Sequence, residues 1–239
     1  MLLRYTCVTA GERRRLEEYI LGMKQFRCRA ILFDLDGVLV DSTGYIEEQW
    51  RGWALSKGLA PEPFLEVCHG RRAVETIRLA APHLDAEAEV AAFVPQKLGE
   101  ASLTAVIGAR ELLAWLPAGS WAVATSGPRE GAIDRLRCAG LPVPGVLICA
   151  EDVLQGKPSP DVYLKAAADL GVAPADCIVI EDAPAGISAA RAAGMRVIAL
   201  TTTHPVEQLS ADACVASLAN IDVRLLTTDG RPLLVVSVG

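Results

Sequence analysis

Two aspartates stand two positions apart at the end of an apolar run, in the segment ILFDLDGVLVDS over residues 31–42. Asp34 and Asp36 would repel each other there, and removing their carboxylates from water adds a further cost. Residues two apart lie on the same side of an extended strand, and Gly37 permits a tight turn directly after them. A chain that keeps this pair needs a positive group beside it, so the segment predicts a charged functional site.

Polar and charged residues also follow three later apolar runs. They are Thr125, Ser126 and Gly127 after WAVA, Lys157 in the loop EDVLQGKPSPD, and Glu181 and Asp182 at the end of CIVIED. Carboxylates bind a hard divalent cation such as Mg²⁺ through oxygen. Hydroxyl groups, backbone N–H groups and a lysine ammonium bind phosphoryl oxygens, and an ionised carboxylate can attack phosphorus to form an aspartyl-phosphate. Together these residue types are suited to phosphoryl transfer.

The elements that must position these residues have the pattern of alternating strands and helices. Five short β-rich runs are expected to be strands, over residues 30–34, 121–125, 146–150, 177–181 and 196–200. Ala-rich stretches with helical apolar spacing separate most of them. This alternation predicts parallel βαβ units, and hence a doubly wound, Rossmann-like α/β fold. Ligands of such sheets bind beyond the carboxyl ends of the strands, which is where the polar residues fall.

One connection is much longer than a crossover requires. About 85 residues separate the first two strands, whereas a crossover needs only about a dozen, and most of them have helical patterns. We predict a small helical cap domain over residues 43–103, inserted into a core domain of residues 23–42 and 104–239, with residues 1–22 as an extension. The alternation around Asp229-Gly230 predicts a C-terminal β-hairpin.

Four segments, in this order and spacing, resemble the signature motifs of the haloacid dehalogenase-like hydrolase superfamily. They are DLDGVLVDS, the strand end ATSG, GKPSPD and VIEDAPAGI, which together span about residues 29–200. A single D-x-D pair is a weak signal, but four motifs that each follow a predicted strand are specific. The helical insertion is similar to the family's small cap domain. Within the family, the chain resembles bacterial sugar and polyol phosphatases and β-phosphoglucomutase.

The resemblance implies a role for four core residues. Asp34 would be the nucleophile that takes the phosphoryl group. Asp36 would protonate the leaving oxygen and then activate water, and its backbone carbonyl would contribute to the metal site. Thr125 and Lys157 would neutralise the phosphoryl charge, and Lys157 would also hold Asp34 ionised. Ser126 replaces Thr125 if the strand ends one residue later, and Gly127 would lie beside the phosphate with it.

The resemblance also implies a Mg²⁺ site at these strand ends. Its residues would be Asp34, Asp36, Glu181 and Asp182, with Asp182 completing the site and Glu181 supporting it. Glu181 and Asp182 could instead cap the helix that follows them. Adjacent acids beside other acids are unfavourable without a cation, which favours the metal.

The predicted cap contains a second group of substrate-binding candidates. His69, Gly70, Arg71 and Arg72 fall where one amphipathic helix ends and another begins, so their side chains could project toward the core. The alternative is that Arg71 and Arg72 only solvate a helix start, and that His69 caps or packs. Basic residues at a helix N-terminus oppose its dipole, which favours a functional reason for them.

The composition limits the classes of partner and compartment. The net charge of −6 and the pI near 5.2 argue against a nucleic-acid surface. No run approaches the roughly 18 apolar residues of a membrane span. Seven scattered cysteines without metal-site spacing predict reduced thiols in a cytoplasmic protein. The sequence does not fix an oligomeric state, and a monomer is slightly favoured.

The favoured function is a Mg²⁺-dependent phosphatase that acts on a small sugar or polyol phosphate. A phosphosugar mutase similar to β-phosphoglucomutase is the alternative, since it shares the motifs and the cap. A dehalogenase needs neither Asp36 nor a metal, and a phosphonate hydrolase would need a better placed cap lysine than Lys57 or Lys97. A non-catalytic protein that binds a phosphorylated ligand is disfavoured by the intact set of Asp34, Asp36, Lys157 and the metal acids.

Overall fold

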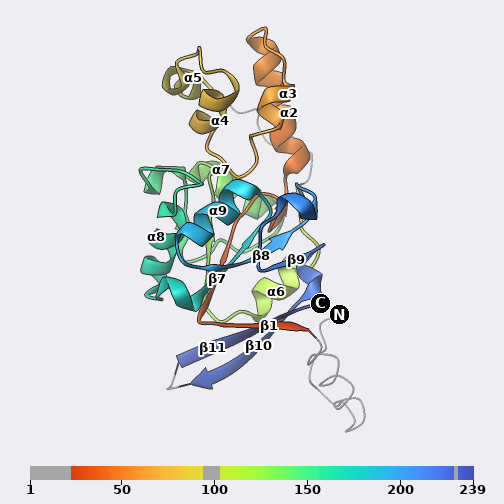
Figure 1. Cartoon of the computed structure of the whole chain (residues 1–239), viewed down its shortest axis with the longest axis vertical. Coiled ribbons are helices and arrows are strands. Elements are labelled where there is room, and N and C mark those ends of the chain that lie inside the picture. The colour runs from red at the N-terminus through yellow and green to blue at the C-terminus, as the bar shows by residue number, and fades with distance from the viewer. Residues whose placement is uncertain (1–22, 94–102, 229–230) are drawn as a thin grey trace.

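A six-stranded parallel sheet forms the centre of the computed structural model, which describes residues 23–93, 103–228 and 231–239 (Figure 1). Its strand order is β6-β5-β2-β7-β8-β9, and every neighbouring pair is parallel. The strands are β2 (Ala30–Phe33), β5 (Trp121–Ala124), β6 (Leu147–Ile148), β7 (Cys177–Glu181), β8 (Arg196–Leu200) and β9 (Ala213–Val215). The five predicted strands are confirmed, three of them slightly shorter than predicted, and β9 adds a sixth.

Helices cover both faces of this sheet. On one face α6 (Ala109–Trp115) and α7 (Arg129–Cys138) pack on Ile31, Phe33 and their neighbours. On the other face α8 (Asp161–Leu170) and α9 (Pro184–Ala192) pack on Ala30, Leu32 and their neighbours. Because both faces are buried, the strands are apolar throughout instead of alternating. The predicted doubly wound α/β fold is confirmed.

Among the described residues, four helices form a separate group that lies above the sheet in Figure 1. They are α2 (Thr43–Ser56), α3 (Glu62–Leu65), α4 (Ala73–Ala80) and α5 (Ala86–Ala92). They enclose their own apolar cluster, in which the Trp50 and Phe64 rings stack with centroids 5.8 Å apart. The short antiparallel strands β3 (Val40–Asp41) and β4 (Thr104–Ala105) pair where the chain leaves and re-enters the core. This group is the predicted cap after the first strand of the parallel sheet; α3 was not predicted, and residues 94–102 lie outside the described ranges.

A second, antiparallel sheet lies below the parallel one (Figure 1). The predicted hairpin is confirmed as β10 (Ile221–Thr228) and β11 (Arg231–Val238), and β1 (Lys24–Cys28) pairs with the outer side of β11. Leu234 and Val236 of β11 are fully buried in the core cluster of the first sheet face. The predicted extension over residues 1–22 lies outside the described residues. Among the described helices, none combines the length and the apolar character that a membrane crossing needs.

Candidate active site

The predicted catalytic and metal-binding residues meet beyond the carboxyl ends of four neighbouring strands, β6, β5, β2 and β7. Phe33 of β2 lies level with Val123 of β5 and Ile180 of β7, so the next residues along each strand face the same edge. The Asp34 backbone N–H donates to Ile180 O at 3.0 Å, which fixes this register at the site. Asp34, Thr125, Lys157, Glu181 and Asp182 are each at most 3% exposed. The sheet therefore gathers these groups in a dry environment.

Lys157 occupies the centre of this group. Its ammonium donates to Asp34 Oδ1 and to Glu181 Oε1, the latter at 2.8 Å, and it lies 4.9 Å from the centroid of the Tyr163 ring. Burial alone would lower the pKa of Lys157, but the Asp34 and Glu181 carboxylates reverse this effect and raise it well above its usual value. The ammonium is therefore a fixed positive charge beside the predicted nucleophile.

Glu181 uses both of its carboxylate oxygens within the protein. Oε1 accepts hydrogen bonds from Lys157 and from the Tyr163 hydroxyl (3.0 Å), and Oε2 accepts from the backbone N–H groups of Asp182 and Ala183 (2.7 and 2.8 Å). Burial opposes ionisation, but Lys157 and these N–H groups together lower the pKa of Glu181 below its usual value. Glu181 was predicted to be one of the metal-site residues. In the structure its carboxylate oxygens instead hold Lys157 and the backbone at the end of β7. Tyr163, which completes this arrangement, was not predicted.

The pKa values of Asp34 and Asp182 are raised, in contrast to that of Glu181. Burial raises the pKa of Asp34 to about 7; Lys157 opposes this shift, and Glu181 and Asp36 add to it. Burial, with Glu181 and Asp34 adding, raises the pKa of Asp182 well above its usual value. Lys157 therefore favours the ionised form of Asp34, as expected, but burial of the carboxyl outweighs this effect. The carboxylates of this site outnumber its single ammonium, and a bound divalent cation would offset the excess negative charge.

The backbone after Asp36 fits closely against Asp182. Gly37 has φ +79°, and a Cβ added there would lie 2.0 Å from Asp182 Oδ2. The Thr202 hydroxyl donates to the Gly37 carbonyl oxygen at 2.7 Å, and the Thr203 hydroxyl donates to the Asp182 carbonyl oxygen at 2.8 Å. Neither threonine was predicted. The chain thus brings the backbone of the first motif against the carboxylate of the fourth.

The donors gathered there fit Mg²⁺. The Asp34 and Asp182 carboxylates and the backbone carbonyl of Asp36 are oxygen donors, and Mg²⁺ usually takes one or two protein carboxylates and keeps several waters. The described part of the chain contains no cluster of three or more His, Cys, Asp or Glu side chains that could hold a metal by themselves. Such a site would rely on few side chains and on water and substrate oxygens.

The Asp36 side chain is held by one hydrogen bond and one ion pair. The Ser42 hydroxyl donates to Asp36 Oδ1 at 2.6 Å, and Arg135 Nε lies 2.8 Å from the same oxygen. Arg135 is nearly buried, on α7, and its guanidinium also fills the space beside Gly127, where a Cβ would lie 2.5 Å from it. Arg135 was not predicted as a site residue. The sequence indicates that it lies on a helix, but not that its side chain contacts Asp36.

The two hydroxyl residues after β5, Thr125 and Ser126, make different contacts. Thr125 Oγ1 accepts from the Gly127 backbone N–H at 3.1 Å, so the hydroxyl lies at the strand end as predicted. The Ser126 hydroxyl instead donates to the carbonyl oxygen of Gly70, in the cap, at 3.0 Å. Ser126 therefore connects core and cap in this arrangement, and Thr125 is the better placed of the two hydroxyls for phosphate.

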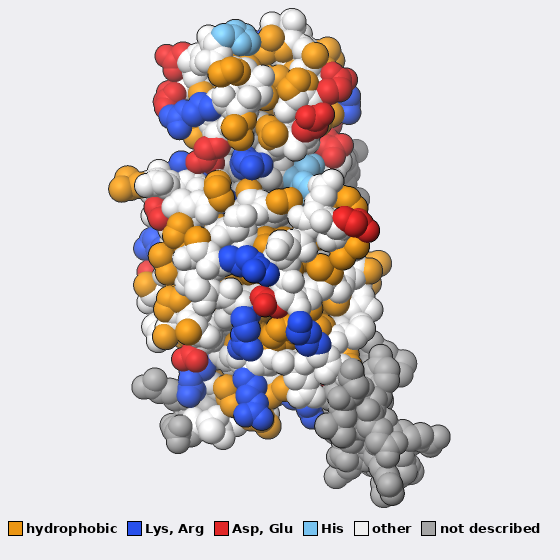
Figure 2. Space-filling model, in the orientation of Figure 1, with side chains coloured by type: hydrophobic (Ala, Val, Ile, Leu, Met, Phe, Trp, Pro, Cys, Tyr) orange, Lys and Arg blue, Asp and Glu red, His pale blue; other side chains and the backbone are white. Residues whose placement is uncertain are grey.

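The four cap candidates lie over the strand ends. Gly70 approaches the core so closely that a Cβ there would lie 2.7 Å from Ala183 Cβ. His69 Nε2 lies 3.3 Å from Glu47 Oε1, and the Arg71 guanidinium donates to Val67 O at 3.2 Å. Arg72 reaches a neighbouring core loop, where its guanidinium donates to the Leu154 carbonyl oxygen. Figure 2 shows acidic, basic and histidine side chains gathered at the waist between the upper helices and the lower body.

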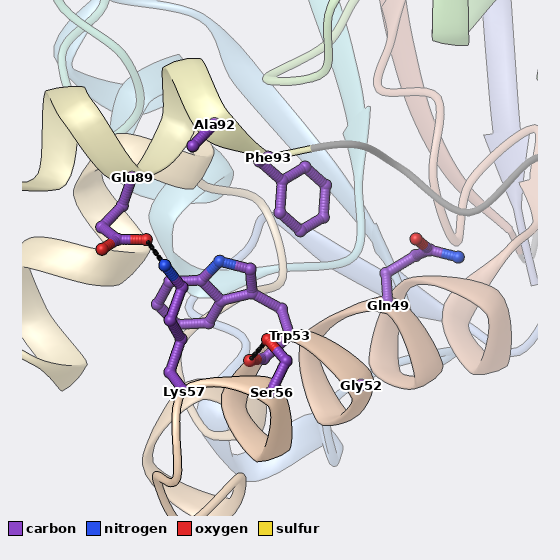
Figure 3. Close-up of a pocket in the computed structure, with 8 residues that line it drawn as sticks. All are labelled: Gln49, Gly52, Trp53, Ser56, Lys57, Glu89, Ala92 and Phe93. Atoms are coloured by element: carbon purple, nitrogen blue, oxygen red, sulfur yellow. Dashed lines mark hydrogen bonds and ion pairs between the residues drawn. The ribbon is translucent and has the colours of Figure 1, made fainter.

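A hollow of about 250 Å³ on the cap does not belong to this site. It lies between α2 and α5 and is lined by Gln49, Gly52, Trp53, Ser56, Lys57, Glu89, Ala92 and Phe93 (Figure 3). An ion pair of 2.5 Å between Lys57 and Glu89 borders it. None of the predicted site residues lines it.

The haloacid dehalogenase-like hydrolase family model matches residues 28–194, a range that contains all four motifs and the cap. The chain belongs to the haloacid dehalogenase-like hydrolases. It is 43% identical to hexitol phosphatase A of Escherichia coli over 208 residues, which cover 82% of this chain and 94% of that protein. It is 38% identical to glycerol-1-phosphate phosphohydrolase 2 of Saccharomyces cerevisiae, over 79% of this chain and 80% of the yeast protein.

A solved structure with a similar fold is β-phosphoglucomutase from Clostridium difficile. The TM-score is 0.66 and the identity 26%, over 80% of this chain and 92% of that chain. Family membership and the phosphatase relatives place this hydrolase among the enzymes that cleave phosphoric monoesters.

Proposed function

We propose that this hydrolase is a Mg²⁺-dependent phosphatase that cleaves a small sugar or polyol phosphate through an aspartyl-phosphate on Asp34. The observation that carries the proposal is the buried contact of Lys157 with Asp34 and Glu181, directly beneath the cap loop that contains Gly70. The two phosphatase relatives, named for hexitol and glycerol phosphates, support the substrate class.

The chemistry begins with attack of an Asp34 carboxylate oxygen on phosphorus. The bond from phosphorus to the ester oxygen breaks, and Asp36 gives its proton to that oxygen, which leaves as an alcohol. Asp36, now ionised, takes a proton from water, and the resulting hydroxide attacks the aspartyl-phosphate. Inorganic phosphate leaves, and Asp34 and protonated Asp36 are restored.

Lys157, Thr125 and the backbone N–H groups after β5 would bind the phosphoryl oxygens. Lys157 is already fixed by Glu181, so it needs little reorganisation as charge develops on those oxygens. A Mg²⁺ ion held by Asp34, Asp182 and the Asp36 carbonyl would supply further positive charge at the phosphoryl group. Gly37 keeps that side of the site free of a side chain.

Substrate choice would reside in the cap. His69 and Arg71 lie over the strand ends and offer donors to hydroxyl groups of a sugar or polyol. We place the cap at residues 43–103 and the core at residues 23–42 and 104–239, since β3 and β4 pair next to both junctions. A closed cap also excludes water from the ester until attack has occurred.

We place the enzyme in the cytoplasm. The described cysteines, Cys28, Cys68, Cys138, Cys149, Cys177 and Cys214, are all free thiols, which suits a reducing compartment.

Release of inorganic phosphate from a panel of sugar, polyol and nucleotide monophosphates, with and without Mg²⁺, tests the proposal. We expect release from sugar or polyol phosphates, only with Mg²⁺, and loss of release in folded Asp34→Asn. A mutase would instead convert one phosphosugar into an isomer without accumulating phosphate. No release from any compound of the panel would rule the phosphatase out.

A further inference from the structure

The cap segment over residues 69–75, which is the loop before α4 and the first turn of that helix, contacts three core loops, and each of these loops carries part of the proposed site. Ser126, next to Thr125, donates to Gly70 O. Gly70 packs against Ala183, next to Asp182. The third contact, from the end of this cap segment to the residues before Lys157, is the most extensive.

Arg72 and Glu75 form the cap side of that third contact. Arg72 Nε donates to Glu75 Oε1 at 2.7 Å, its Nη2 lies 2.6 Å from the same oxygen, and its backbone N–H donates to Glu75 Oε2 at 3.0 Å. The two side chains are only 17% and 20% exposed. Because the pair is mostly shielded from water and fixed at several atoms, it differs from an ordinary surface ion pair, which contributes little.

The pair then reaches across to the core. Glu75 Oε1 accepts from the Gly156 backbone N–H at 3.2 Å, and the Arg72 guanidinium donates to the Leu154 carbonyl oxygen at 3.3 Å. Both ends of one cap ion pair therefore bind the backbone of one core loop. The Glu75 carboxylate accepts from the backbone N–H of this loop, and the Arg72 guanidinium donates to its carbonyl oxygen.

Gly156 makes this approach possible. A Cβ at this position would lie 2.5 Å from Arg72 Nε and 2.5 Å from Glu75 Oε1. The next residue is Lys157, whose ammonium touches Asp34 and Glu181. The backbone that the cap holds is thus one residue away from the side chain on which the phosphoryl site depends.

We propose that Arg72 and Glu75 are positioning residues that latch the cap to the Lys157 loop. When the latch is formed, the backbone of residues 154–156 is fixed and Lys157 is seated against Asp34. When the cap lifts, the Gly156 N–H and the Leu154 carbonyl lose these partners and the loop loosens. Cap closure and placement of the phosphate-binding lysine are then one event. The functional meaning of the latch depends on the proposed role of Lys157, but its existence does not.

Hydrogen–deuterium exchange of the peptide that covers residues 150–158 tests the latch without any substrate. Glu75→Ala should raise the exchange rate at residues 154–157 by about tenfold, the effect of losing hydrogen bonds to a charged group. Glu75→Gln retains an acceptor for Gly156 and should show a smaller increase. Glu87→Ala is the matched control, because it removes the exposed Arg78–Glu87 pair within the cap and should leave this peptide unchanged.

Gly156→Ala tests the same contact from the core side. The added methyl group displaces Arg72 and Glu75, so exchange in residues 154–157 should rise as it does in Glu75→Ala. With the substrate found by the phosphate-release panel, both variants should lower kcat by about tenfold or more, with a smaller change in KM, because misplacement of a catalytic group weakens the transition state selectively.

Unchanged exchange at residues 154–157 in folded Glu75→Ala and Gly156→Ala would overturn the latch. Should Glu75→Ala fail to fold, Glu75→Gln and Gly156→Ala decide the matter by the same measurement. Equal effects of Glu75→Ala and Glu87→Ala would also overturn it, since they would reflect general loosening of the cap. A chain that releases no phosphate but shows the expected exchange would refute the proposed function and keep the latch.

Discussion

Four hydrogen bonds converge on the carboxylate of Glu181, two on each oxygen. At the scale of single residues, this carboxylate determines how the site is held together. It fixes Lys157, and through Lys157 it fixes Asp34. A cation at Asp34 and Asp182 would then complete the balance of charge. The sequence predicted these charged residues, because their types and their positions after strands are local features.

Tyr163→Phe tests the support of Glu181. The change removes the hydroxyl that donates to Glu181 Oε1 but keeps the ring beneath Lys157. We expect a loss of about 1.5–3 kcal/mol in the free energy of unfolding, the net value of a hydrogen bond to a charged group, measured by urea denaturation. A Tyr163→Phe protein as stable as the wild type would show that this hydrogen bond contributes nothing.

Exposed cysteine thiols should react with iodoacetamide faster than buried ones. Burial raises the pKa of Cys28 and Cys177 to about 12 and that of Cys149 to about 11, with smaller effects of neighbouring charges. A raised thiol pKa keeps the unreactive protonated form at pH 8, whereas Cys138 is exposed. Mass spectrometry after brief labelling should find Cys138 modified and these three intact. All should react in urea; native labelling of Cys177 at the rate of Cys138 would contradict the structure.

At the scale of elements, the parallel sheet is what brings distant residues together. Strands were predicted well because short apolar runs followed by polar residues are visible in the chain itself. The elements that were not predicted depend on contacts between residues that are far apart in the sequence. β1 pairs with β11 from the opposite end of the chain, and α3 is a single turn held by the packing of Phe64 on Trp50 and Trp53. Arg135, Tyr163, Thr202 and Thr203 were missed for the same reason.

Gly37→Ala tests the turn between β2 and β3, with Gly58→Ala as its control. Both glycines have positive φ, +79° and +69°, but only Gly37 faces Asp182, while no described atom lies within 4 Å of a Cβ at Gly58. Each change should cost about 1 kcal/mol of stability from the backbone alone. Only Gly37→Ala should also abolish phosphate release and weaken Mg²⁺ binding, measured by calorimetry. Equal activity of the two variants would show that the approach to Asp182 is unimportant.

At the scale of the whole molecule, a sheet with helices on both faces is extended at both ends. The cap has its own apolar cluster above the site, separate from the two clusters of the core. Below, the antiparallel sheet closes the core by burying β11 side chains against the first sheet face. The hairpin was predicted from its turn, whereas its packing on the core was not, because a hairpin pattern does not show what its apolar face covers.

Leu234→Ala tests this lower sheet. Leu234 is fully buried, whereas Leu226 on the paired strand is 48% exposed, so Leu226→Ala is the control. We expect Leu234→Ala to lower the free energy of unfolding by about 2–5 kcal/mol, the usual cost of a cavity in a core, and Leu226→Ala to have little effect. Similar small losses in both variants, by urea denaturation, would show that the lower sheet is peripheral.

The most direct test of the proposed reaction is to find where the phosphoryl group goes. The wild type would be mixed with Mg²⁺ and a substrate from the panel, quenched in acid within one turnover, digested and mapped by mass spectrometry. We predict a phosphoryl group on Asp34 and on no other residue, with neither label nor phosphate release in Asp34→Asn, and a fall in turnover on the order of a thousandfold or more. Phosphate release without a phosphorylated Asp34, or normal turnover by Asp34→Asn, would contradict the mechanism.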